Sequence, residues 1–460
     1  MAAVYPTSSR EGPAWSPRSP RLGTLVAVNR SLVAVLFGTF TLRFSTGLTG
    51  ALLVYYLADR PRHGGQPVDP LVVGVLAATF FLAELVLSPP FGVISDRLGQ
   101  RPVMQLGPGF GAVAVILAGL TTSIPLLGVT RLLEGGSSAA SVPSILGYIA
   151  RATARDEPLR GRVVARFELA TLAGLGVGLV AAGPLYQLLG RVAFFANALV
   201  YIGSWLVYRF LVLELPATVT VADRPSNPGF ARYRALLSSS QVWLLAPTWI
   251  AVNAVIGLWT SQSLFQLVRR VNIPIARHQL LMRGFTPTQV SVGVAVGMLV
   301  FSAGLLYWGS RFRTLRRTTI IFYGLAGGTF AVACTFVVNH SGGQPLVVTI
   351  LFAIAAAAGL FVMAGATPAA LGLLADVSEA HPFDRGAIMG LYSVFLAIGQ
   401  IAGSLIGGAA ARLLGIDGLL ASSVVLLGLA VLPLSRMRAV EHLLDADGRQ
   451  LSKGVGVLGA

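Results

Sequence analysis

The sequence predicts an all-α integral membrane protein, with twelve transmembrane helices in two six-helix bundles that are related as parallel repeats. The prediction rests on the composition, on a series of long apolar runs and on an internal repeat. Of the 460 residues, 55% are hydrophobic and only 11% are charged, and the mean hydropathy is +0.75. A soluble protein needs about 25% charged residues to cover its surface, so most of this surface must face lipid.

Apolar runs place the spans, because about 20 mostly apolar residues cross the hydrocarbon core of a bilayer. They predict an N-terminal bundle over 31–212 with spans at 31–57, 71–95, 103–121, 124–150, 163–188 and 192–212. They predict a C-terminal bundle over 242–434 with spans at 242–266, 288–308, 319–338, 345–375, 386–411 and 417–434. Three polar segments remain, which we expect to be a disordered tail (1–30), a linker (213–241) and a second tail (435–460).

The basic residues indicate how the chain is oriented in the membrane. The net charge is +16, but the arginines lie in short connections between apolar runs, as the positive-inside rule describes, so they do not indicate a nucleic-acid partner. We expect a plasma-membrane protein with both termini and the linker in the cytoplasm, and with 58–70 and 267–287 outside. The connection 267–287 carries four arginines and disagrees with the rule, so either it forms an interfacial helix on the outer face or the count of spans fails there.

An internal repeat supports the count. The segment "GGSSAASVPSILGYIARATARDEPLRG" (135–161) aligns without gaps with "LFVMAGATPAALGLLADVSEAHPFDRG" (360–386), which pairs Pro143 with Pro368 and Arg160 with Arg385. Spans four and five then correspond to spans ten and eleven. Parallel repeats of six spans are the organisation of one large class of secondary transporters, whose substrate site lies between the halves near the bilayer midplane.

The connection between the second and third spans, "GVISDRLGQR" (92–101), resembles the signature of the major facilitator superfamily, which runs Gly-x-x-x-Asp-Arg-x-Gly-x-Arg at this place. The matching residues are Gly92, Asp96, Arg97, Gly99 and Arg101, whereas Gln100 stands where a basic residue is usual. The resemblance covers essentially residues 31–434.

This resemblance implies a gate at the cytoplasmic face. Gly99 suits the end of a helix, and the two arginines hold the connection inside, but topology alone does not explain Asp96. In the family this carboxylate meets the start of span eleven, where a helix N-terminus favours negative charge. A degenerate copy of the signature in the second half (309–317) carries Arg313 in place of the acid. The alternative is a tight turn with charges that set topology.

Two further stretches resemble motifs of the family. "TRLLEGGSSAA", with Arg131, resembles the fourth-span motif, and "GLGVGLVAAGPLYQLLG" resembles the fifth-span antiporter motif through Gly174, Gly178, Gly183 and Pro184. The fifth-span stretch departs from the motif at Gln187 and Leu188, where the family has a pair of glycines. The motif therefore does not decide between antiport and another form of coupling. Close helix packing is the alternative role for these glycines.

Four ionisable residues inside the spans are candidates for substrate binding and proton coupling, because each costs roughly 2.5–3.5 kcal/mol at mid-span. They are Arg43, Glu84, Arg131 and Glu134. Arg131 and Glu134 share one helix face, and a glutamate held between desolvation and a nearby arginine can bind and release a proton. The alternative is structural pairing of Arg43 with Glu84 or Glu134.

The leading interpretation is a secondary active transporter that works by alternating access and couples the efflux of small amphipathic compounds to protons. Its partners would be a small-molecule substrate, a proton or other coupling ion and the bilayer, and we expect a monomer without cofactor, metal or enzymatic activity. The alternative in the same fold is a permease for an anionic metabolite, in which Arg43 and Arg131 would bind the carboxylate or phosphate of the substrate. A membrane enzyme or sensor is disfavoured, since the sequence has no His-Glu-x-x-His, phosphate-loop or Cys/His metal motif.

Overall fold

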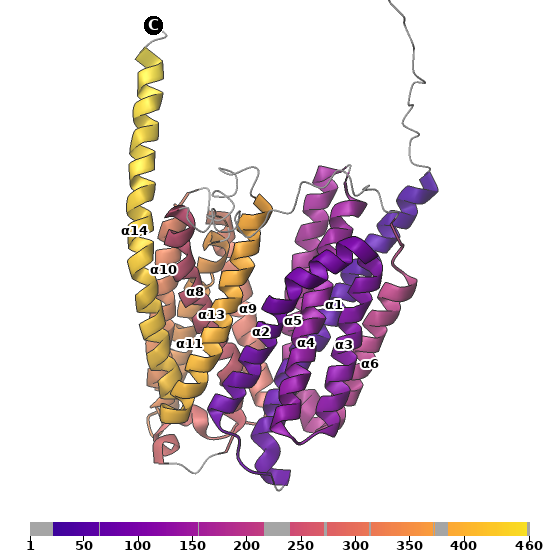
Figure 1. Ribbon diagram of the computed structural model, residues 1–460. Helices are drawn as coiled ribbons and strands as arrows, with labels where there is room; N and C mark the ends of the chain where they lie inside the picture. Colours follow the sequence, from indigo (N-terminus) through magenta and orange to yellow (C-terminus); the bar gives the residue numbers. More distant parts are fainter. Residues whose placement is uncertain are drawn as a thin grey trace, which may run out of the picture.

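The structure is a computed structural model that describes residues 22–63, 65–154, 156–215, 240–270, 274–311, 314–370, 372 and 385–457. Its long elements are α-helices (Figure 1). The first bundle contains α1 (Leu22–Asp59), α2 (Pro70–Leu98), α3 (Gln100–Leu120), α4 (Ile124–Ala152), α5 (Glu157–Leu189) and α6 (Val192–Phe210). The second contains α8 (Ser240–Val268), α9 (Pro287–Ser310), α10 (Arg317–Asn339), α11 (Leu346–Met363), α13 (Arg385–Leu414) and α14 (Ile416–Val457).

Connections between helices gather at two ends of the molecule. We call the end that carries residues 92–102 the motif end, and the end that carries the α1–α2 connection the distal end; they lie at the top and bottom of Figure 1. Ten helices among the described residues are long and apolar enough to cross a membrane. The other two, α4 and α8, carry several buried polar side chains. The predicted all-α membrane fold is confirmed.

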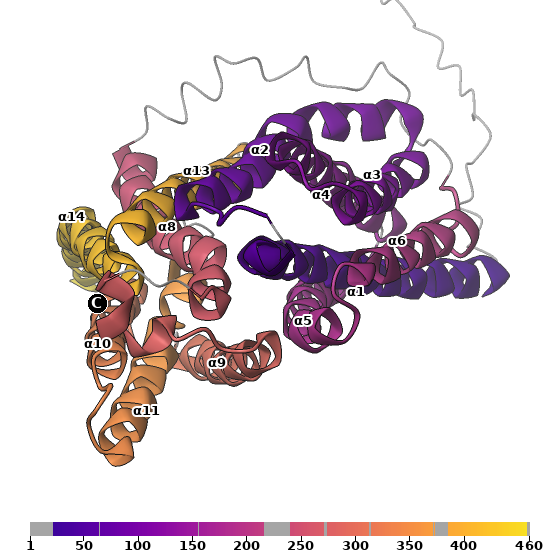
Figure 2. The same cartoon turned by 90° about the horizontal axis from the view of Figure 1, so that it is seen from below.

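The two bundles lie side by side and meet through α2, α5, α8, α9 and α13 (Figure 2). The first bundle packs around α1, whose main neighbour is α5, and α4 packs against both α2 and α3. Its apolar core includes the fully buried rings of Tyr55, Tyr148 and Tyr201. Phe265 and Val290 of the second bundle belong to the same core cluster, so the bundles share buried apolar surface near the distal end.

Helix ends recur at the spacing of the sequence repeat. Helices α2 and α9 both begin with a proline, Pro70 and Pro287, after a side-chain cap. Proline suits the first helical position because its missing N–H would have no partner there. Helices α5 and α13 both end before a glycine with positive φ, Gly190 at 53° and Gly415 at 63°, a conformation that other residues rarely adopt. The repeat therefore places equivalent turns in both bundles.

The three largest differences from the predicted boundaries are at α1, at α14 and in the tenth span. Helix α1 begins at Leu22, so residues 22–30, which we expected to be part of a disordered tail, are helical. Helix α14 runs on to Val457 through the segment that we expected to be the second tail. The tenth span is interrupted, since α11 ends at Met363 and a turn follows at 364–365.

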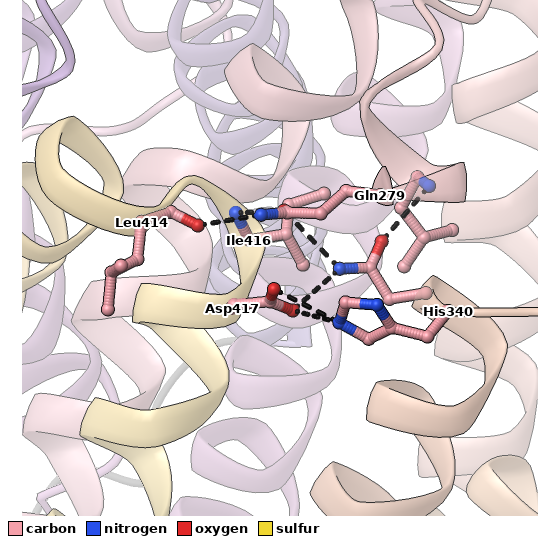
Figure 3. Close-up of polar contacts among 7 residues, drawn as sticks. Gln279, His340, Leu414, Ile416 and Asp417 are labelled. Carbon is pink, nitrogen blue, oxygen red and sulfur yellow. Dashed lines mark hydrogen bonds and ion pairs between the residues drawn. The ribbon is translucent and has the colours of Figure 1, made fainter. Parts of the chain in front are cut away.

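The described part of the arginine-rich connection 267–287 lies at the distal end and contains no α-helix between the end of α8 and the start of α9. Its described part forms two short 3₁₀ helices, Pro274–His278 and Leu280–Met282. Between them the buried Gln279 donates to the carbonyl of Leu414 at 2.8 Å and accepts from the N–H of Ile416 at 2.9 Å (Figure 3). The connection is thus fixed to the α13–α14 turn.

The same network continues to the end of α10. Asn339 donates to Oδ1 of Asp417 at 2.8 Å and accepts from the N–H of Leu281 at 3.1 Å. Nε2 of His340 lies 3.0 Å from Oδ2 of Asp417 (Figure 3). Three connections of the second bundle are joined in this way, because the polar backbone of a packed loop must find partners within the protein.

Candidate functional site

Three helices of the first bundle join their polar side chains near the middle of the spans. Nη1 of Arg43, on α1, donates to Oγ of Ser138, on α4, at 3.0 Å. The Ser138 hydroxyl in turn donates to Oε1 of Glu84, on α2, at 2.5 Å. Arg43 and Glu84 are therefore connected through a hydroxyl.

Next to this chain lies a buried ion pair. Arg131 and Glu134 stand one turn apart on α4 and their side chains contact directly. Arg131 is only 7% exposed and Glu134 only 1%. The guanidinium also stacks on Phe80 of α2, with Cζ 5.3 Å from the ring centroid, an arrangement in which the face of the ring attracts the cation. The predicted shared face of Arg131 and Glu134 is thus present.

Glycines allow these helices to approach so closely. At Gly135 of α4, a Cβ atom would lie 2.7 Å from Cβ of Ala83 and 3.1 Å from N of Glu84. At Gly174 of α5, a Cβ atom would lie 3.0 Å from Cβ of Arg43. Real side chains do not tolerate such distances, so the glycines set how near α2 and α1 come to the polar residues.

The other fifth-span residues have different surroundings. Gly178 packs on α1, where a Cβ atom would lie 3.0 Å from N of Leu48. Gly183 crosses to the second bundle, and its N–H donates to Oγ of Ser291 on α9 at 3.1 Å. Pro184 is exposed inside the continuous helix α5. The geometry of Gly174 and Gly178 corresponds to the packing alternative, and that of Gly183 to a contact between the bundles.

Sequence reasoning missed Ser138, although a signal was present. Arg131, Glu134 and Ser138 follow one another at positions i, i+3 and i+7, the spacing of one helix face. The segment around Ser138 is rich in small residues, and nothing in its composition distinguishes this serine from Ser137 or Ser141. Only the packing of α2 and α1 against α4 shows which hydroxyl meets charged partners.

The second bundle contributes neutral polar groups. Asn253 donates to the carbonyl of Trp249 within α8 at 2.9 Å. Oε1 of Gln400, on α13, is buried without a hydrogen-bond partner. Unsatisfied buried polar atoms cost about 1–3 kcal/mol, so an amide in this position is available to a bound molecule.

The motif residues form a compact corner between α2 and α3. Gly99 ends α2 with a φ of 96°. Gln100 is buried and its Oε1 accepts from Nη1 of Arg151, on α4, at 2.5 Å. Arg101 donates to the carbonyl of Arg209 and lies 3.6 Å from the carboxylate of Glu214. The departure from the family signature at Gln100 has a physical reason, because a basic residue there would repel Arg151.

Asp96 is exposed at the end of α2, as is Arg97. In the described part of the chain Asp96 makes no hydrogen bond or ion pair. Its expected partner, the start of span eleven, corresponds to the first residues of α13, whose side chains lie outside the described residues, and so does Arg313. The gate therefore stays a prediction.

Comparisons with known proteins agree with this architecture. The sequence model of the Major Facilitator Superfamily matches residues 35–276. The chain is 20% identical over 389 residues to quinolone resistance protein NorA of Staphylococcus aureus (strain MRSA252), which covers 83% of this chain and 90% of that protein. It is 25% identical over 345 residues to multidrug resistance protein 1 of Bacillus subtilis (strain 168), which covers 73% and 79%.

Solved structures show the same fold. The nucleoside transporter NupG superposes with a TM-score of 0.65 at 14% identity and covers 90% of this chain and 98% of its own. A bacterial homolog of the human lysosomal transporter Spinster, in an inward-facing and occupied conformation, superposes with a TM-score of 0.66 at 13% identity, with coverage of 92% and 98%. The likeness extends over both bundles.

Proposed function

The chain belongs to the Major Facilitator Superfamily, and from this premise we propose that it is a proton-coupled exporter of small amphipathic compounds that works by alternating access. The multidrug and quinolone resistance proteins among its relatives support efflux as the direction of transport. We further propose that the motif end faces the cytoplasm of a plasma membrane, with both termini on that side, as the arginines of the connections indicate.

The observation that carries the proposal is the chain from Arg43 through Ser138 to Glu84. A carboxylate within a membrane span is costly and marks a functional site by default. Glu84 is only half-buried, and its hydrogen-bond partner is a hydroxyl. It can therefore exchange that partner for a cationic substrate or accept a proton, and it cannot do both at once. This mutual exclusion is what exchange of a substrate for a proton requires.

From the sequence alone, Glu134 beside Arg131 is the stronger candidate for the proton site and Glu84 the weaker one; we propose the opposite order. Glu134 is almost fully buried and is neutralised by Arg131. Breaking such a buried pair costs about 3–5 kcal/mol, which a proton cycle would have to supply in every turnover. We therefore assign the exchange of substrate for a proton to Glu84. The Arg131–Glu134 pair stays intact through the cycle and supplies a constant electrostatic field beside Glu84.

Purified protein in liposomes under an imposed pH gradient tests the proposal with a panel of cationic and neutral drugs. We expect flux that depends on the gradient in the parent protein. Glu84→Gln should lose uphill transport of every drug and keep downhill movement of neutral drugs, since it removes the proton site together with the charge that a cationic drug would meet. Glu157→Gln, which changes an exposed acid in the first turn of α5, is the matched control. Uphill transport by Glu84→Gln at the parental rate would exclude Glu84 as the proton site.

One observation supports the permease for an anionic compound. Arg43 is half-buried and uses only its Nη1 in the hydrogen bond to Ser138, so it has further donors for a carboxylate or phosphate. The charge of the substrate separates the two functions. Expression in a host that lacks drug exporters should raise resistance to cationic drugs only if the chain is the exporter.

A further inference from the structure

Helices α2 and α13, one from each bundle, touch backbone to backbone at the distal end. A Cβ atom at Gly408 of α13 would lie 2.9 Å from Cα of Leu71 and 3.0 Å from the carbonyl oxygen of Pro70. On the facing side, a Cβ atom at Gly74 of α2 would lie 3.2 Å from Cα of Gly408. The first turn of α2 thus packs on α13 with no room for a side chain between them.

An ion pair crosses the seam one turn away from this contact. Asp69 caps α2, since its Oδ1 accepts from the N–H of Leu71 at 2.8 Å. Its other oxygen, Oδ2, lies 3.1 Å from Nε of Arg412 on α13. The side chain of Arg412 is 58% exposed and that of Asp69 is 36% exposed, so water and salt screen the pair. Arg269, at the end of α8, also interacts electrostatically with Asp69.

A buried hydrogen bond holds the same turn from a second side. Gln262, on α8, is fully buried, and its Nε2 donates to the carbonyl of Pro70 at 3.0 Å. Gln266 donates to Oε1 of Gln262 at 3.3 Å, so the amide is held in its orientation. Separation of the bundles at this end would leave the Gln262 amide without this partner.

The seam has a counterpart on the other side of the molecule. Gly183 of α5 packs on the start of α9, at Pro287 and Ser291. The pairs Gly183 and Gly408, Pro287 and Pro70 are related by the repeat spacings of 225 and 217 residues, since 183 + 225 = 408 and 70 + 217 = 287. The counterpart is joined by the bond from the Gly183 N–H to Ser291, whereas the α2–α13 seam has Asp69 and Arg412. The two bundles therefore meet at the distal end through two equivalent contacts, and only the α2–α13 contact has an added ion pair.

We propose that Asp69, Arg412 and Gln262 form a latch that stabilises the state closed at the distal end, and that this latch must break each time that end opens. The inference rests on alternating access as the proposed function. It adds a second polar switch to α2, because Asp96 lies at the other end of the same helix. A helix of 29 residues is about 44 Å long along its axis, several times the Debye length of about 8 Å, so Asp69 and Asp96 do not interact with each other directly through their charges.

Cysteine accessibility tests the latch without substrate or proton gradient. Val290 is buried in the core that the two bundles share, so Val290→Cys in a Cys334→Ser background should react with an impermeant maleimide from the distal side only when that end opens. Asp69→Asn should raise the labelling rate up to about fivefold, the range of an exposed ion pair. An asparagine still accepts the N–H of Leu71, so this variant keeps the helix cap.

Two further variants and a control make the test specific. Arg412→Gln should raise the rate in the same direction but less, because Arg269 remains near Asp69, and combining it with Asp69→Asn should add little. Gln262→Ala should raise labelling about tenfold, as expected for a lost buried hydrogen bond. Arg62→Gln is the control, because it breaks the 3.0 Å ion pair of Arg62 with Asp59 within one bundle at the same end, and it should leave labelling unchanged.

Unchanged labelling in Asp69→Asn and in Gln262→Ala would overturn the latch. An equal increase in Arg62→Gln would overturn it too, since the effect would then be a general loosening of the distal end. Size-exclusion profiles that match the parent exclude misfolding as the cause. A failure of pH-driven flux would contradict the proposed function and would not affect these labelling rates, so the two outcomes are distinguishable.

Discussion

Replacing one member of the buried Arg131–Glu134 pair should destabilise the protein far more than replacing both. The two side chains are 7% and 1% exposed, so the Arg131→Met variant leaves a carboxylate with no counter-charge in a low-dielectric interior. Removing one partner of such a pair costs about 3–5 kcal/mol. The double variant Arg131→Met/Glu134→Leu removes both charges, and apolar replacement of a buried pair is often close to neutral in stability.

The single cysteine provides the assay. Cys334 is buried in α10, so a thiol-reactive fluorophore added to purified protein in detergent reports unfolding as the temperature rises. We expect each single variant to unfold at a clearly lower temperature than the parent, and the double variant to unfold nearer the parent. Destabilisation of the double variant equal to the sum of the two single effects would refute the reasoning, since additive residues do not interact.

The same double variant separates a structural role from a transport role. If the double variant is stable and does not transport, the charges of Arg131 and Glu134 are needed for substrate transport, as the fourth-span resemblance implies. If it is stable and transports at the parental rate, the pair contributes only to folding. Arg131→Ala alone cannot decide between these, because a loss of flux could follow from the unpaired carboxylate of Glu134.

Three further predictions follow from the described geometry and the motif. Asp96→Asn should insert into the membrane and keep its thermal stability, but it should transport poorly and label more readily at a cysteine on the motif side. Arg313→Ala should behave like the parent. If the two variants behave alike, the connection 92–102 is a turn without a gating role. Gly178→Leu should lower the unfolding temperature in the fluorophore assay, because α1 leaves no space at that position and overpacking costs about 1–3 kcal/mol or more. Gly50→Ala is its control, because Gly50 faces open space. Pro225→Cys in the Cys334→Ser background should react only from the cytoplasmic side, and labelling from outside would contradict the orientation.

Local signals in the sequence mark several of the turns. Pro70 after Asp69, and Pro287 after Thr286, begin helices because proline and a capping oxygen both suit a first turn. Gly99 and Gly415 follow helix ends in conformations that need glycine. Such signals depend on a few neighbouring residues, so they can be read without knowledge of the tertiary structure. The repeat added long-range order, because equivalent turns had to occur twice.

Contacts between helices were harder to predict. The hydroxyl of Ser138 meets Arg43 and Glu84 because Gly135 and Gly174 let three backbones converge, and no local pattern in the sequence reports such convergence. The connection 267–287 is a second tertiary feature that no local pattern reports. Its hydrogen bonds to the ends of α10 and α13 hold it at the distal end, and in the proposed orientation this places its four arginines outside, against the charge rule.

Helix α2 connects the three polar features that we assign to transport. Its first turn is held by Arg412 and Gln262 of the second bundle, its middle carries Glu84, and its last turn carries Asp96. Glu84 lies 14 residues after Pro70 (84 − 70 = 14), or about 21 Å along the axis, near the middle of the helix and before Pro89 and Pro90, the two prolines inside it. When the distal latch breaks, α2 can tilt against α13, and the bond from Ser138 to Glu84 must then stretch or exchange. Protonation of Glu84 weakens that same bond, because a neutral carboxyl accepts less strongly than a carboxylate. We therefore expect that Glu84→Gln, which imitates the protonated state, also raises distal labelling at Val290→Cys, whereas Glu134→Gln does not raise it through this route.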